Sequence, residues 1–95
     1  MRTKRPRALQ IHARDNVAVA LTAIHRGDTV GVTGPTGDVF AVTAESDIPF
    51  GFKMALTDIA TGETVVKYGE SIGEATEPIS RGVLTHVNNI RGTRA

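Results

Sequence analysis

The sequence feature that most constrains the fold is an internal repeat. Residues 20–30 and residues 55–65 share the pattern A-L-T-x-I-x-x-G-D/E-T-V at an offset of 35 positions. Residues 78–83 repeat the I-x-x-G part of this pattern a third time. A chain that repeats itself builds the same supersecondary unit at each copy. We therefore expect a fold assembled from copies of one short unit.

Each repeat is predicted to contain one helical turn and then a strand. Thr22 and Thr57 stand where an N-cap residue would accept a hydrogen bond from the turn. Gly27 and Gly62 follow where a positive φ angle would end the turn. Threonine and valine come next, and both residue types favour strands. The unit is thus interpreted as a turn, one helical turn, a glycine and a strand.

Further short strands are predicted outside the repeats. Alternating or fully apolar stretches occur at residues 9–12, 17–20 and 54–56. Residues 38–44 carry apolar side chains on both faces, so both faces of this strand are expected to be covered. Turns are predicted at residues 34–38, 48–51 and 67–70. These features predict an all-β fold of seven or eight short strands, with one-turn helices at the corners.

The main alternative is an amphipathic helix over residues 16–25. The run Val17–Leu21 is compatible with either a helix or a strand. The second repeat favours the strand, because Pro49 and Gly51 interrupt the chain just before it.

Length and composition limit the class of protein. A chain of 95 residues with 40% apolar residues accommodates one domain with a thin core. The sequence has no cysteine, which excludes disulfide scaffolds, thiolate metal sites and cysteine nucleophiles. No apolar run approaches the ~18 residues of a membrane span. We expect a cytoplasmic protein with no membrane partner.

Charge is distributed unevenly along the chain. Residues 1–14 carry five basic residues and no acid, whereas residues 15–90 carry ten acids and four bases. We therefore predict a basic arm at residues 1–8 and a single domain at residues 9–95. A basic arm can bind phosphates, but the body is acidic and does not interleave aromatic with basic residues for base stacking, so nucleic acid is not expected as a partner. A solvated arm, an acidic partner and a second copy of the chain all remain open.

Three ordered segments then resemble a known family. They are D-N-V-A-V-A-L at residues 15–21, I-P-F-G-F-K-M-A-L at residues 48–56 and K-Y-G-E-S-I-G-E-A-T at residues 67–76. Together they resemble the SAF-type (β-clip) domain of altronate and galactarate dehydratases, over about residues 11–92. In that family the domain is fused to a large catalytic region or forms a small subunit, as in sulfolactate sulfo-lyase. The resemblance implies a β-clip fold.

The resemblance also implies a function. It suggests the small subunit of a metal-dependent carbon–oxygen lyase that dehydrates a sugar acid such as altronate or galactarate, or eliminates sulfite from sulfolactate. A larger catalytic subunit would be the partner. A divalent metal, iron or manganese, would be shared with that partner. The alternative is a non-catalytic accessory module that binds sugar acids.

Two departures from the family pattern affect the candidate site. The family reads I-P-x-G-H-K where this chain has Phe52, and H-x-H-N where it has Asn88. His86 keeps the first histidine of the second pattern, and we expect it to be a catalytic base or metal ligand. Lys53 is the second catalytic candidate. The candidate substrate-binding residues are Lys67, Asn88, Asn89, Asp15 and Asn16.

Each candidate also has a structural interpretation. His86 would be a hydrogen-bonded histidine of an edge strand, and Asn88 and Asn89 would shape a turn. The two lysines would pair with surrounding acids. Asp15 and Asn16 would form side-chain hydrogen bonds to the backbone ahead of a strand.

Overall fold

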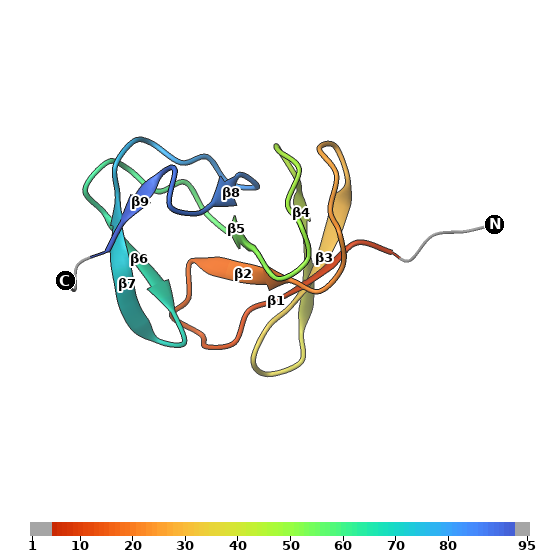
Figure 1. Cartoon of the computed structure of the whole chain (residues 1–95). Helices are drawn as coiled ribbons and strands as arrows, with labels where there is room; N and C mark the ends of the chain where they lie inside the picture. The colour runs from red at the N-terminus through yellow and green to blue at the C-terminus, as the bar shows by residue number, and fades with distance from the viewer. Residues whose placement is uncertain (1–4, 93–95) are drawn as a thin grey trace.

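The computed structural model describes residues 5–92 and contains nine β-strands (Figure 1). Their bounds are β1 Arg7–Leu9, β2 Val17–Ala20, β3 Thr29–Thr33, β4 Val39–Thr43, β5 Lys53–Ala55, β6 Thr64–Lys67, β7 Glu70–Ala75, β8 Leu84–Thr85 and β9 Ile90–Arg91. Within residues 5–92 there is no helix, so none spans a membrane. The all-β prediction is confirmed, whereas the predicted one-turn helices are absent from this part of the chain.

The strands form two sheets. The larger has the order β4-β3-β1-β2-β5-β8, and the smaller has the order β6-β7-β9. Neighbouring strands are antiparallel except for β1 and β3, which are parallel. The β3–β4 hairpin and the β6–β7 hairpin lie on opposite sides of β2 and β5 (Figure 1). The two middle strands therefore connect the halves of the molecule.

The internal repeat corresponds to two copies of a four-strand unit that share β5. The first copy runs from β2 to β5, and the second runs from β5 to β8. In each copy the first strand pairs antiparallel with the last, as in the pairs Val19 with Lys53 and Met54 with Leu84. Because β5 closes one copy and opens the next, two units fit into a chain of this length.

The corners are β-turns instead of helical turns. At the first corner Gly27 has φ +92° and its N–H donates to the Ala44 carbonyl at 2.8 Å, while the Asp28 N–H donates to the His25 carbonyl at 2.9 Å. Because the glycine N–H bonds to Ala44, just after β4, and not to a carbonyl four residues earlier, it does not continue a helix. Thr22 is not a cap either, since its hydroxyl oxygen accepts from the Arg7 N–H.

The same turn occurs four times, once more than the sequence repeat indicates. The extra copy is Ile48–Gly51, which was predicted as a turn but not as a copy of the repeat, although it also reads I-x-x-G. The four isoleucines form two backbone bridges, Ile24 with Ile48 and Ile59 with Ile79. Each bridge has two N–H···O bonds of 2.7–2.9 Å. The bridged corners hold each copy closed.

Each copy surrounds its own core. The first core contains eleven buried residues: Ala8, Ala18, Ala20, Ile24, Val30, Val32, Val42, Ala44, Ile48, Met54 and Leu56. The second contains six: Val17, Ala55, Ile59, Val65, Ala75 and Ile79. Strands β2 and β5 contribute to both cores because successive side chains of a strand point to opposite faces. Residues on β5 can therefore face either half of the molecule.

Two strand predictions are corrected by the structure. In β4, Val39 is 66% exposed and Phe40 is 36% exposed, so the faces of residues 38–44 are not both covered. This follows from the position of β4 at the edge of its sheet.

The first strand begins at Arg7 and ends at Leu9, where residues 9–12 were predicted. Arg7 and Ala8, assigned to the basic arm, thus pair with β2 and β3. Arg5 and Pro6 of that arm lead into β1, and residues 1–4 lie outside the described part of the chain.

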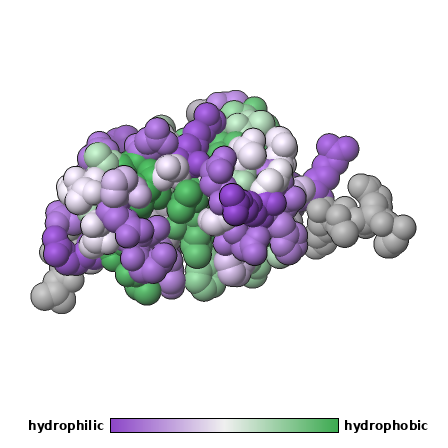
Figure 2. Space-filling view, turned by 90° about the horizontal axis from the view of Figure 1, so that it is seen from above, coloured by the Kyte–Doolittle hydropathy of each residue, from purple (hydrophilic) through white to green (hydrophobic). Residues whose placement is uncertain are grey.

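The surface is mainly polar with separate apolar patches. Figure 2 shows apolar residues as islands among polar ones on one face of the molecule. The large apolar or aromatic side chains exposed among residues 5–92 are Val39, Phe40, Phe50, Tyr68 and Val87.

Candidate functional site

The shared strand β5 presents two neighbouring residues to opposite sides. Lys53 pairs with Val19 on β2 and with Thr85 on β8. Phe52 immediately precedes it and packs against the first core. Because side chains alternate along a strand, Lys53 points away from Phe52, toward the half that contains β6 and β7. Each face of β5 therefore carries a different set of candidate residues.

On one face, Lys53 lies beside Lys67. Partial burial lowers the pKa of Lys53, and the charge of Lys67 lowers it further. Within residues 5–92 the one ion pair joins Arg91 to Glu74, at 2.6 Å. The predicted pairing of both lysines with surrounding acids is therefore not observed there. Neither lysine forms an ion pair within residues 5–92, although Glu70 faces Lys67 across the β6–β7 hairpin, and two neighbouring cations favour an anion.

A tight hairpin turn places an aromatic ring next to this pair. Tyr68 and Gly69 have φ +58° and +75°, and the flanking Lys67 and Glu70 are paired, as in a two-residue hairpin of the primed type. The Lys67 Nζ lies 4.9 Å from the centroid of the Tyr68 ring. Tyr68 is 58% exposed, and its ring contacts the lysine. The K-Y-G-E segment was enough to predict this turn, but it did not predict the contact between Lys67 and the Tyr68 ring.

Asp15 and Asn16 fix the loop that approaches this hairpin. The Asp15 carboxylate accepts hydrogen bonds from the Gly69 N–H at 2.8 Å and the His12 N–H at 3.0 Å. The Asn16 side chain accepts from the Val66 N–H at 2.8 Å and donates to the Thr64 carbonyl at 3.0 Å. These bonds match the structural interpretation of both residues. Their substrate-binding role stays a prediction.

His12 reaches the same hairpin from the other side. A Cβ placed on Gly69 would lie 2.8 Å from His12 Cδ2, so the ring packs directly on the glycine. His12 Nδ1 accepts a hydrogen bond from the Arg14 N–H at 3.1 Å. Nε2 is thus the ring nitrogen of His12 that can still bond to another group.

On the opposite face, His86 lies against Phe52. Their ring centroids are 4.7 Å apart and the ring planes are inclined by 54°. His86 directly follows the short edge strand β8. Phe52, at the position where the resemblance implies a histidine, thus places an apolar ring beside His86. Sequence reasoning identified the substitution but not this contact.

Asn88 and Asn89 have different environments. Asn89 is 2% exposed, accepts from the His86 N–H at 2.8 Å and donates to the Leu84 carbonyl at 2.7 Å. It therefore shapes the turn that holds His86. Asn88 is exposed, and its side chain is free to contact a ligand or a partner.

The predicted site residues thus fall into two groups. Lys53 and Lys67 lie together, with Asp15 and Asn16 tied to the same hairpin. The second group is the turn that contains His86, Asn88 and Asn89. Within residues 5–92 no three histidine or carboxylate side chains are placed to hold a metal ion. The donors in this part of the chain do not fit a complete metal site.

Comparison with known proteins identifies related sequences. The family model for the altronate/galactarate dehydratase SAF domain matches residues 6–93. Altronate dehydratase from Escherichia coli (strain K12) is 47% identical over 83 residues, which are 87% of this chain and 16% of that protein. Galactarate dehydratase (L-threo-forming) from the same organism is 35% identical over 74 residues, 78% of this chain and 13% of that protein.

A much shorter relative is also similar. The (2R)-sulfolactate sulfo-lyase subunit alpha from Paracoccus pantotrophus is 40% identical over 63 residues, which are 66% of this chain and 92% of that subunit. This chain therefore spans about a sixth of the altronate dehydratase it matches and nearly all of a small subunit.

Proposed function

This chain belongs to the altronate/galactarate dehydratase SAF-domain family, and from that premise we propose that it is the small part of a lyase that acts on an acidic substrate together with a larger catalytic partner. The substrate class is a sugar acid, such as altronate or galactarate, that loses water. Sulfolactate, which would lose sulfite, is the second member of the class. Both types of substrate carry a carboxylate, and the proposed site must bind it.

The observation that carries this proposal is the lysine pair. Burial and the charge of Lys67 disfavour the ammonium form of Lys53. A carboxylate bound by Lys67 would offset that repulsion, while burial, the larger cause, would still favour the neutral amine of Lys53. The exposed ring of Tyr68 borders the pair and leaves access for a small ligand. The matched relatives supply the class of anion, and the lysines supply the means of binding it.

The reaction requires a base and a group that binds the carboxylate, and the two lysines are the candidates for these roles. Elimination moves a proton from the carbon next to the carboxylate to a base, while the bond to the hydroxyl or sulfonate group breaks. A lysine with a lowered pKa is neutral more often at a given pH and is then a base. Lys53 is therefore the proposed proton acceptor on this chain, and Lys67 holds the carboxylate.

His86 is proposed to act with the partner. It lies at the end of an edge strand, beside the exposed Asn88. Within residues 5–92 no other histidine or carboxylate completes a metal site around it. We therefore propose that the His86 imidazole is one ligand of a divalent metal, iron or manganese. The remaining ligands of that metal would come from the larger partner. No step of the proposed reaction on this chain depends on that ion.

One observation favours the alternative of a non-catalytic, acid-binding module. Phe52 fills the position of a family histidine and packs its ring against the first core and His86. A chain that has lost one imidazole in this way could retain the lysine site and bind acids without turnover. Such a module would bind the substrate equally well with or without the partner.

The experiment that tests the proposal is reconstitution. The tagged chain is used to isolate proteins from its source lysate, the retained chains are identified by mass, and the mixture is assayed with altronate, galactarate and sulfolactate. The proposal expects a large dehydratase-like chain in a comparable amount, and turnover of one acid. Binding of an acid without turnover in any mixture would instead establish the accessory module.

The metal assignment has its own readout. We expect the His86→Ala variant to assemble with the large chain but to lower the iron or manganese content of the purified complex. An unchanged metal content would remove His86 from the site, whatever the effect on turnover.

A further inference from the structure

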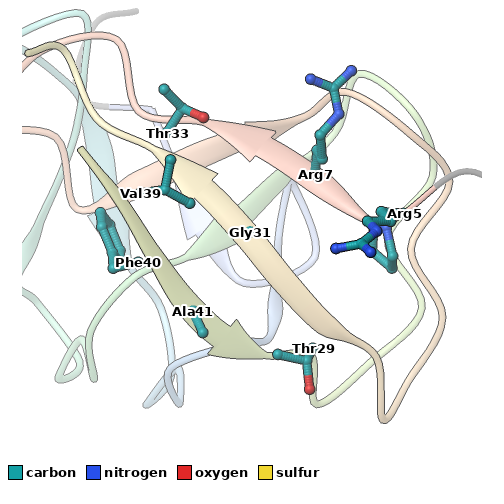
Figure 3. A pocket seen from close by; sticks show the side chains of 9 residues that line it. Arg5, Arg7, Thr29, Gly31, Thr33, Val39, Phe40 and Ala41 are labelled. Carbon is teal, nitrogen blue, oxygen red and sulfur yellow. The ribbon is translucent and has the colours of Figure 1, made fainter. Parts of the chain in front are cut away.

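The end of the larger sheet has a groove on the side that faces away from the core. Val30 and Val32 of β3 are buried in the first core. The residues between and beside them point outward and, with the chain leading into β1, line a groove of about 680 Å³. Figure 3 shows Gly31 of β3 in the middle of this groove, with Arg5 and Arg7 on one side and Ala41 on the other.

The floor of the groove is small and apolar. Gly31 is paired with Ala41 across the β3–β4 ladder. A Cβ added to Gly31 would meet only ordinary contacts, Val39 Cγ1 at 3.8 Å and the Pro6 carbonyl oxygen at 4.0 Å, so the floor has room above it. Val39 is 66% exposed at its edge and Phe40 is 36% exposed. Covering this surface would remove apolar area from water, which is favourable.

The rim of the groove is cationic. Arg5 and Arg7 are exposed, and no carboxylate is among the residues that line the groove. Within residues 5–92 neither arginine forms an ion pair. Thr29 and Thr33, on the same face of β3, offer hydroxyl groups between the rim and the floor. The groove thus combines two free guanidinium groups with an apolar strip along the strands.

We propose that this groove binds an extended, acidic segment of the large catalytic partner. An extended segment places alternate side chains on one face, and small apolar ones would cover Gly31 and Ala41. Aspartate or glutamate side chains beside them would reach Arg5 and Arg7, whose planar guanidinium groups bind carboxylates in two-point contacts. This inference rests on the proposed function, because the occupant is the partner of that complex.

Nucleic acid fits the groove less well. Single-stranded nucleic acids bind where successive aromatic rings follow a cationic track. Phe40 is the one aromatic residue that lines this groove, and the floor is aliphatic. The groove therefore matches a peptide better than a chain of phosphates and bases.

The test measures binding of the co-purified large chain to variants of this chain. One variant reverses the rim charge (Arg5→Glu with Arg7→Glu), and a second fills the floor (Gly31→Val). The matched control is Arg14→Glu, which reverses an exposed arginine outside the groove. We expect each groove variant to lower affinity by about tenfold or more, and the control to stay within about twofold. Added salt should weaken the wild type and have less effect on the charge-reversed variant.

The outcomes separate this inference from the proposed function. Wild-type affinity for the large chain in both groove variants would overturn the groove as the docking site, while the lyase complex would stand. Failure of the wild type to bind any large chain would overturn both. A homodimer that the charge reversal dissolves, or retention of DNA that it abolishes, would likewise overturn the proposal if binding of the large chain were unchanged. Should Gly31→Val fail to fold, the two arginine substitutions alone decide the matter.

Discussion

Lys67 lowers the pKa of Lys53 across the space between β6 and β5. Burial of Lys53 is the larger cause, and the like charge of Lys67 adds to it. The two strands belong to different sheets, so the fold, and not the local sequence, brings the two ammonium groups together. Two neighbouring cations that form no ion pair within residues 5–92 constitute the most specific chemical feature of this part of the chain.

The first prediction concerns pH. The folded pKa of Lys53 lies below its usual value of 10.5, so between these two values the unfolded chain binds more protons than the folded one. Stability should therefore rise as the pH increases through that window, and the penalty should be present in full below the folded pKa. Lys67→Gln should raise the pKa of Lys53 and flatten the slope. Titration of the lysine signals by NMR, with denaturant unfolding at each pH, measures both effects.

The control for this prediction is Arg26→Gln, which removes an exposed cation from a different corner. It should leave the titration of Lys53 unchanged. An equal flattening in the Arg26 and Lys67 variants would show that the net charge of the protein, and not the lysine pair, causes the effect.

The second prediction concerns anion binding. Lys67→Gln should weaken binding of the substrate acid to the reconstituted complex by about tenfold or more, because the charge-assisted contact to the carboxylate is lost. Lys53→Arg keeps a positive charge beside Lys67 and should leave the acid bound, but it should abolish turnover, because a guanidinium stays protonated. Calorimetry with the acid and a turnover assay separate these effects. If the arginine variant turned over normally, Lys53 would not be the base.

Sequence reasoning predicted the fold class and the repeat because both depend on local patterns. The I-x-x-G segments and the strand at Val17–Ala20 are local, and the structure contains them. The shape of the corners depends on bonds between distant residues, such as Gly27 N–H to Ala44, and was therefore predicted incorrectly. The exposure of β4 was missed for the same reason, because it depends on which strand lies at the edge of the sheet.

The sequence indicated which residues to consider as a site but not how these residues are arranged. Lys53 and His86 were placed in one catalytic group, whereas the structure directs Lys53 toward β6 and stacks His86 on Phe52, which packs on the first core. Side chains alternate between the two faces of a strand, so the sequence alone could have indicated that positions 52 and 53 point in opposite directions. The sequence contains no comparable signal for the approach of Lys67.

The third prediction compares two corner glycines with nearly identical backbones. Gly27 has φ +92° and Gly82 has φ +91°. A Cβ on Gly27 would meet no atom within 4 Å, so Gly27→Ala should cost only the conformational penalty, about 1–2 kcal/mol. A Cβ on Gly82 would collide with the Thr43 carbonyl oxygen, and Gly82→Ala should cost clearly more or prevent folding. Equal losses of melting temperature in the two variants would contradict the close packing of the Gly82 corner against the end of β4.

The last prediction compares the two neighbouring asparagines after β8. Asn89 is buried and its side chain makes two backbone hydrogen bonds, whereas Asn88 is exposed. Asn89→Ala should lower the free energy of unfolding by about 2–3 kcal/mol, because the His86 N–H and the Leu84 carbonyl lose their partners. Asn88→Ala should change it by less than about 0.5 kcal/mol. Asn89→Asp retains an acceptor for the His86 N–H but places a second oxygen against the Leu84 carbonyl, so its stability should fall between the other two, as measured by urea unfolding. If Asn89→Asp proved as stable as the wild type, the bond to Leu84 would contribute nothing, and the turn that positions His86 would be held by the acceptor side of Asn89 alone.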